Sequence, residues 1–275
     1  MSDFNPLQKY FRQPKIYVSL PSKGLYYAPG SFQGDYNSVP IMAMTGLDEI
    51  VMRTPDALFN GEAAYKVIES CCPYIKDAKS VPSIDIDTLL MAIKIATFGP
   101  TLRIDQTCPH CQHENEYELD LNALMEYFKT QKFVSYLEID QNLSIKIRPL
   151  TFEQANYFGV ENFKLQKTAF QAQNIENEDE KTNTVNQIFN DLSELQLTLL
   201  LASIESVQVD NTTVTDQTHI ITWLKNMERE IFDLIKNKLE DNKNNWSAPD
   251  QEVQCGNCQT ASTVKPVLDQ SNFFV

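Results

Sequence analysis

The sequence predicts an α+β protein in which helical layers alternate with β-hairpins, and in which two Cys-x-x-Cys knuckles, distant in sequence, form one ribbon-like element. Three observations support this prediction. Apolar residues recur at helical spacing in two long stretches, they alternate with polar residues between these stretches, and the two knuckles are the repeated element of the chain. With 275 residues, the chain is long enough to bury a core without disulfides as its main support.

Pattern changes divide the chain into five expected segments. They are an extended N-terminal arm with short strands (1–44), a helical region (45–100), a β-rich region with the first knuckle (101–150), a second helical region (151–245), and a C-terminal segment with the second knuckle and a tail (246–275).

Prolines and glycines interrupt the N-terminal arm, which favours extended chain over helix. Short β-like pieces lie at Ile16–Leu20 and Leu25–Tyr27. An arm of this kind buries little of itself, so its aromatic side chains are expected to pack on the rest of the protein or on a neighbouring subunit. These aromatic residues are Phe4, Tyr10, Phe11, Tyr17, Tyr26 and Tyr27.

Three short helices are expected between residues 45 and 100. Their boundary signals are Thr45 or Asp48 as the first cap, Asn60 as the second cap, Pro73 as the second stop, Ser83 to Asp87 as the third start, and Gly99-Pro100 as the third stop. In the β-rich region, alternating strands are expected at Leu102–Ile104 and Glu116–Leu121 on either side of the first knuckle. A second hairpin is expected at Tyr136–Ile139 and Leu143–Ile147.

The second helical region is expected to begin at Thr151. The acidic stretch 174–183 is typical of a solvated loop or linker, and a helix should follow it from Thr184 to about Ser206. A tight hairpin over 207–214 then leads to one long amphipathic helix, capped by Thr215 or Asp216. The apolar stripe of that helix, Ile220 to Leu239, is expected to face the core.

Four of the six cysteines form two matched pairs, Cys108 with Cys111 and Cys255 with Cys258. Two intervening residues let both thiolates of a pair point at one tetrahedral centre. The sequence therefore predicts one structural zinc per chain, held by all four cysteines. Two alternatives stay open: a site that uses His110 or His113 with the first knuckle alone, and a site that has lost its metal. Cys71 and Cys72 are expected to be buried structural thiols.

Charge and missing motifs exclude several classes of function. The net charge of −14 argues against a protein that coats nucleic acid or binds an anionic membrane surface. No stretch approaches the length of a membrane span, and the N-terminus lacks the pattern of a signal peptide, so a reducing cytoplasm is the expected place of synthesis. The chain contains no Gly-rich phosphate loop, His-Glu-x-x-His motif or nucleophile elbow, so an enzyme is not expected.

Several segments, taken in order, carry a resemblance to a known family. They are Leu20–Tyr27, Val39–Glu49, Leu58–Gly61, Asp85–Gly99, the Cys-Pro-His-Cys knuckle before an acidic strand, and the final Cys-Gly-Asn-Cys with its Phe273-Phe274 tail. Together they resemble the baseplate hub proteins of T4-like contractile-tailed bacteriophages. That family includes structural hub subunits and a hub assembly factor. The resemblance implies no enzymatic activity, and it implies partners among the other hub and tail proteins.

The expected function is therefore that of a structural subunit of a phage tail baseplate hub, assembled in the host cytoplasm and retained in the virion. Copies of the chain are expected to form a symmetric ring around the tail axis. Two other functions stay open. One is a hub assembly chaperone that is absent from the mature particle, and the other is a zinc-ribbon module associated with nucleic acid.

Overall fold

The computed structural model describes residues 5–53 and 61–266, and it divides the chain into two compact units. Unit 1 contains residues 1–131 and 247–275, and unit 2 contains residues 132–246. Unit 2 is thus inserted between the two parts of unit 1. Both units combine helices with small antiparallel sheets, so the predicted α+β class is confirmed. The division into five segments stays a prediction.

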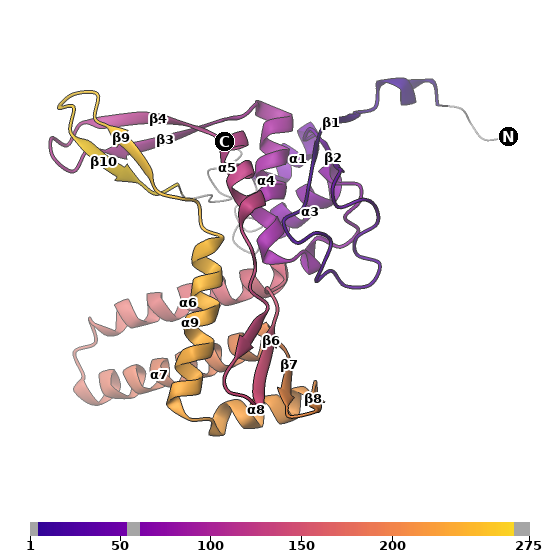
Figure 1. Ribbon diagram of the computed structural model, residues 1–275. Helices are drawn as coiled ribbons and strands as arrows, with labels where there is room; N and C mark the ends of the chain where they lie inside the picture. Colours follow the sequence, from indigo (N-terminus) through magenta and orange to yellow (C-terminus); the bar gives the residue numbers. More distant parts are fainter. Residues whose placement is uncertain (1–4, 54–60, 267–275) are drawn as a thin grey trace. The chain divides into compact units, whose positions relative to one another are not determined.

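Unit 1 is built around one buried helix, α4 (Ser83–Phe98), which contacts β1, β2, α3 and α5 (Figure 1). Its other N-terminal elements are η1 (Pro6–Tyr10), β1 (Pro14–Val18), β2 (Val39–Met42), α1 (Gly46–Met52), α3 (Glu62–Cys71) and η2 (Ala78–Ser80). The three expected helices are present. Thr45 caps α1 in a reciprocal capping box with Asp48, and Gly99 ends α4. The expected cap Asn60 lies outside the described residues.

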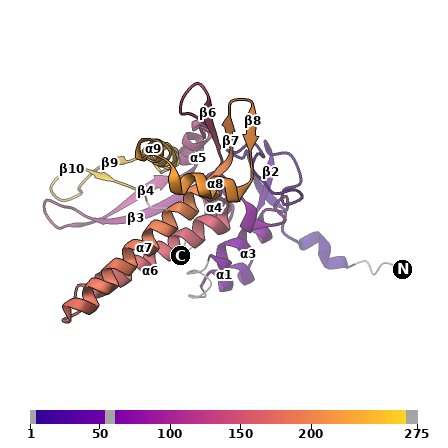
Figure 2. The ribbon, with the colours of Figure 1, turned by 90° about the horizontal axis from the view of Figure 1, so that it is seen from below.

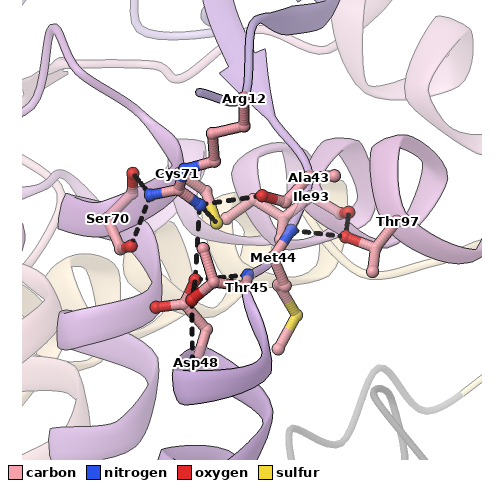
Figure 3. Close-up of polar contacts among 9 residues, drawn as sticks. All are labelled: Arg12, Ala43, Met44, Thr45, Asp48, Ser70, Cys71, Ile93 and Thr97. Atoms are coloured by element: carbon pink, nitrogen blue, oxygen red, sulfur yellow. Dashed lines mark hydrogen bonds and ion pairs between the residues drawn. The ribbon is translucent and has the colours of Figure 1, made fainter. Parts of the chain in front are cut away.

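Polar contacts of Arg12 anchor the arm to the rest of unit 1, as Figure 3 shows. The Arg12 guanidinium donates to Ala43 O at 2.8 Å, to Ser70 O at 2.6 Å, and to the Asp48 carboxylate at 3.3 Å. It thereby links the end of β2 to α1 and α3. Farther along the arm, Leu20 is 3% exposed and Ile41 is fully buried. Leu20 and Ile41 of the arm thus pack within unit 1, whereas the aromatic side chain of Tyr17 is 63% exposed and does not pack there.

The expected strand at Leu25–Tyr27 is wrong, because this segment follows a turn over residues 21–24 and contains a bend at Tyr26. Asp85 of α4 is fully buried and accepts hydrogen bonds from the Ser22 N–H (2.8 Å), the Ser22 hydroxyl (2.5 Å) and the Tyr27 hydroxyl (2.9 Å). These bonds draw the chain back over α4. Lys23 in the turn and Tyr26 in the bend adopt positive φ angles, which an extended strand would not allow.

Two antiparallel hairpins complete unit 1. The first pairs β3 (Thr101–Thr107) with β4 (Glu114–Asp120), and the second pairs β9 (Gln251–Gln254) with β10 (Ala261–Val264). Each hairpin carries one knuckle, and the hairpins lie side by side in both views (Figures 1 and 2). After β4 the structure has a helix, α5 (Leu121–Thr130), in a region where the sequence analysis expected β-structure. Asp120 caps α5, and Leu121, Leu124 and Phe128 pack inward from one face.

Unit 2 contains a four-stranded antiparallel sheet in the order β5-β6-β7-β8. The strands are β5 (Tyr136–Glu138), β6 (Leu143–Ile147), β7 (Ile204–Val209) and β8 (Thr212–Val214), so both expected hairpins are confirmed. The helices are α6 (Phe152–Ala172), α7 (Glu178–Ser203), α8 (Gln217–Asn226) and α9 (Arg229–Asn245). Ile145, Ile147 and Ile204 from the sheet form a core with Ile220, Leu224 and Ile235 from the helices.

Helices α6 and α7 form a long pair whose connection is shorter than predicted (Figure 2). The acidic stretch is not a loop throughout, because α7 begins at Glu178, six positions before Thr184. The Asn177 side chain accepts the N–H groups of Asp179 and Glu180 at 3.0 and 3.1 Å. Acidic residues in the first turn of a helix also interact favourably with the positive end of the helix dipole. The acidic residues that are typical of a linker in the sequence therefore stabilise the start of α7.

The single long helix expected near the end of unit 2 is also wrong. Asp216 caps α8 as expected, but Met227 and Glu228 are extended and separate α8 from α9. A straight helix over both would be about 44 Å long, too long for both ends to reach one core. The break lets Ile220 of α8 and Ile235 of α9 enter the same cluster, so the stripe is core as predicted.

Candidate metal centre

The two knuckles have the same backbone pattern. In the first, the Cys108 N–H donates to His113 O at 2.8 Å and the Gln112 N–H donates to Cys108 O at 3.0 Å. In the second, the Cys255 N–H donates to Thr260 O at 3.1 Å and the Gln259 N–H donates to Cys255 O at 3.0 Å. Both glutamines have a φ of 58°. This left-handed residue turns the chain back into the second strand of each hairpin, so both cysteines of a knuckle project from one tight turn.

The four cysteine sulfurs meet between the two hairpins. Cys108 Sγ lies 3.8 Å from Cys258 Sγ, and Cys111 Sγ lies 3.6 Å from Cys255 Sγ. All four sulfurs lie within 4.8 Å of one another. The first cysteine of each knuckle thus contacts the second cysteine of the other, and neither knuckle supplies a complete site alone.

These distances fit a tetrahedral thiolate centre. A Zn–S bond of about 2.3 Å corresponds to a sulfur–sulfur edge of about 3.8 Å in a regular tetrahedron. The measured contacts of 3.6 and 3.8 Å match this edge and are far longer than a disulfide bond of about 2.05 Å. The four cysteines therefore lie close enough together to hold one metal ion, with four sulfur ligands.

Hydrogen bonds around the sulfurs favour thiolates at the second knuckle. The backbone N–H groups of Cys258 and Asn257 outweigh burial and lower the pKa of Cys255 to about 6. The Thr260 hydroxyl, 3.3 Å from Cys258 Sγ, and the Thr260 N–H lower the pKa of Cys258. Metal ions bind thiolates, so the lowered pKa values of Cys255 and Cys258 favour cation binding at the second knuckle near neutral pH.

Cys111 differs from these two cysteines. The His113 N–H lowers its pKa, but burial and the neighbouring cysteine sulfurs outweigh this effect and bring that pKa to about 11. In a metal-free centre Cys111 therefore keeps its thiol proton at pH 7. Binding of a divalent cation by the Cys111 thiolate would release this proton, so the affinity for metal should increase with pH.

Two asparagines that the sequence analysis did not single out contact the centre. Asn115 at the start of β4 accepts the Gly256 N–H at 2.9 Å, and its amide donates to Cys255 Sγ at 3.6 Å. Asn257, inside the second knuckle, donates to Cys111 Sγ at 3.7 Å. Asparagines are common in turns, so nothing in their spacing indicates this role; the structure shows it by bringing the knuckles together.

The remaining candidate residues lie apart from the centre. His110 and His113 are exposed beside the first knuckle, and neither belongs to the group of side chains that meet there. Cys71 and Cys72 are fully buried between α3 and Pro73, as predicted. Burial raises the pKa of Cys71 to about 11, despite the opposing effect of Arg12. Both thiols are therefore protonated at pH 7, and Cys71 accepts a contact from Arg12 at 3.6 Å.

A family model described as T4 bacteriophage base plate protein matches residues 40–275. The match includes both knuckles and all of unit 2. The chain belongs to this family. The predicted relationship to T4-like phage baseplate proteins is thereby confirmed, and it implies a component of the virion tail. No curated protein and no solved structure matches the chain.

Membership of the base plate family favours a structural role over a catalytic one. It also places the chain among proteins that assemble with other tail proteins. Among the described residues, no helix combines the length and the apolar character needed to cross a bilayer.

Proposed function

We propose that this base plate protein is a structural subunit of the hub of a contractile phage tail, acting through protein–protein contacts. The family match over residues 40–275 carries the proposal. The neighbours would be other hub and tail proteins, with no nucleic acid and no membrane as partner. The net charge of −14 supports this choice, because a chain with this excess of carboxylates repels phosphate groups.

The proposal includes one structural zinc per chain, bound by Cys108, Cys111, Cys255 and Cys258. The arrangement of four sulfurs supports it, since four thiolates leave no open position for a substrate. The ion would hold β3–β4 and β9–β10 together, and thus tie the C-terminal part of unit 1 to the N-terminal part. In a particle that transmits force, such a tie would resist separation of the two parts.

The tip of the arm, residues 5–11, is the segment that we propose contacts a neighbour. Leu7, Tyr10 and Phe11 are 61%, 73% and 57% exposed, and η1 buries none of its residues. In Figure 1 the tip projects from the rest of unit 1 on the N-terminal side of β1. A second copy in a symmetric ring or another hub protein would cover these side chains.

Quantitative mass spectrometry of stringently washed phage particles tests the function. A hub subunit should be present at a small fixed number of copies per particle and should remain after the washes. Detection of the chain in infected cells, together with its absence from washed particles, would overturn the structural proposal in favour of a hub assembly chaperone that acts in the host cytoplasm.

A further inference from the structure

The amide groups of Asn115 and Asn257 cross over between the two knuckles. Asn115 lies in β4 of the first hairpin and donates to Cys255 of the second knuckle at 3.6 Å. Asn257 of the second knuckle donates to Cys111 of the first at 3.7 Å. The two sulfurs that receive these amides are the pair that lie 3.6 Å apart. Each half of the centre therefore supplies a donor to a sulfur of the other half.

We propose that Asn115 and Asn257 are positioning residues for the metal centre, holding the Cys255 and Cys111 thiolates toward one ion. Asn115 has three contacts that orient its amide. Its Nδ2 donates to His113 O at 3.0 Å as well as to the sulfur, and its Oδ1 accepts the Gly256 N–H at 2.9 Å. It thus joins the turn of one knuckle to the turn of the other without any metal.

The chemistry of the centre explains why amides occupy these positions. Four thiolates around a divalent cation carry a net charge of −2. Donors around the ligands offset that charge and fix the direction of the sulfur lone pairs, as outer-shell partners of metal ligands commonly do. A carboxylate at position 115 would still accept the Gly256 N–H, but a carboxylate at either position would repel the thiolates. Asparagine combines an acceptor for Gly256 with a donor for Cys255, which neither aspartate nor leucine can provide.

The inference rests on the proposed metal centre, and the test separates the two. Wild-type protein, N115A, N257A and N115D would be purified as full chains and loaded with zinc. Competition with a chromogenic chelator then gives the dissociation constant. His113→Ala is the matched control, because this exposed side chain lies in the first knuckle but does not join the sulfur cluster.

We expect the dissociation constant to rise about 10- to 100-fold in N115A and N257A, and more in N115D, with no change in the control. The thiolate-to-metal absorption of the cobalt-loaded protein should also shift in both alanine variants. Asn257 is exposed, so its variant should keep the stability of the metal-free wild type. A loss of stability that is equal in the metal-free and the metal-loaded forms of a variant would mean that the asparagine has a purely structural role.

Three results overturn the inference: wild-type affinity in both alanine variants, an unchanged cobalt spectrum, or an affinity loss matched by the His113→Ala control. Wild-type protein that binds neither zinc nor cobalt would instead overturn the metal centre itself. Affinity that falls in N115A alone would leave Asn115 as the positioning residue and remove Asn257 from the proposal.

Discussion

Asn242 of α9 holds both backbone polar groups of Val134. Its Oδ1 accepts the Val134 N–H at 3.0 Å, and its Nδ2 donates to Val134 O at 3.1 Å. Asn242 is 3% exposed. Its buried side chain thus supplies the hydrogen bonds that a partner strand would otherwise give to Val134, just before β5. The end of α9 is thereby joined to the first strand of unit 2, across 108 positions of sequence.

Replacing Asn242 with alanine should destabilise unit 2 by about 1–3 kcal/mol, because it leaves two backbone groups without their partners. Urea unfolding followed by the fluorescence of Trp223 and Trp246, which both belong to unit 2, measures this change. Asn244→Ala is the matched control, since Asn244 lies in the same helix turn and is exposed. Equal stability of the two variants would mean that water replaces the amide at no cost.

Arg12→Ala should cost unit 1 about 2–4 kcal/mol. The substitution removes a guanidinium that donates to Ser70 and Ala43, and it leaves the buried Asp48 carboxylate without its cation. Arg12→Lys should retain only part of the stability that Arg12→Ala loses, because an ammonium group cannot reproduce the planar arrangement of N–H donors in a guanidinium. Chemical denaturation checks both, with the exposed Lys9→Ala as control. A lysine variant as stable as wild type would contradict this account of the anchor.

Removing residues 2–11 should leave the fold intact, whereas removing residues 2–38 should not. The first deletion takes away the exposed tip, and the second takes away β1, the Arg12 anchor and the Ser22 contact with Asp85. Circular dichroism and thermal unfolding of both proteins measure the difference. Particle assembly with the shorter deletion then tests the tip alone. A folded, cooperative 2–38 deletion would show that the arm contributes little to unit 1.

Stability of the loop over α4 should increase as the pH falls from 7 toward 4. Burial raises the pKa of Asp85 to about 6, although Ser22 and Tyr27 donate to it. The folded state therefore binds a proton that the unfolded state, with a carboxyl pKa near 3.8, does not bind in this window. Protonation through pH 6 stabilises the fold, and the gain is complete near pH 4.

The comparison that isolates this effect is wild type against Asp85→Asn, because the cysteines also titrate in metal-free protein. The melting temperature of wild type relative to that of the Asp85→Asn variant should increase as the pH is lowered. Asp87 has a pKa raised by burial to about 6 and remains in both proteins, so its contribution cancels. Parallel curves from pH 4 to 7 would show that Asp85 does not titrate as described.

Removing zinc should destabilise unit 1 while the melting of unit 2 changes little. Free zinc at about 1,000 times its dissociation constant would stabilise the folded state by about 4 kcal/mol. Calorimetry with and without a chelator measures the effect, and elemental analysis should find one zinc per chain. Cys258→Ser, a change at an exposed ligand position, should bind less metal, whereas His110→Ala should not. Four titratable free thiols with no metal in wild type would refute the centre.

Local signals in the sequence were sufficient for most helices and hairpins. Thr45 precedes an apolar stretch with Asp48 three positions later, and the structure shows that capping box. Helix α5 also has a local signal, since Leu121, Leu124 and Phe128 follow helical spacing. This signal is short and directly follows the alternating pattern of a strand, which favours β-structure for the whole region.

The errors arose where tertiary contacts determine the backbone. Nothing local interrupts the chain at Met227 and Glu228, and the break exists because two helix segments share one core. The turn over residues 21–24 is held by the hydrogen bond from Ser22 to Asp85, 63 positions away. The cysteine spacing likewise predicted two half-sites, but the amides of Asn115 and Asn257 could be recognised only after folding had brought them to the sulfurs.

The insertion of unit 2 between the two knuckles has a consequence for synthesis on the ribosome. Cys111 and Cys255 are 144 positions apart, so at about 5–20 residues per second the second knuckle emerges about 7–30 s after the first. During that time the first two thiols have no partners, and unit 2 can fold as a continuous segment. All four sulfurs of the proposed centre can therefore meet only after Cys258 has emerged, which would make metal binding a late step of synthesis.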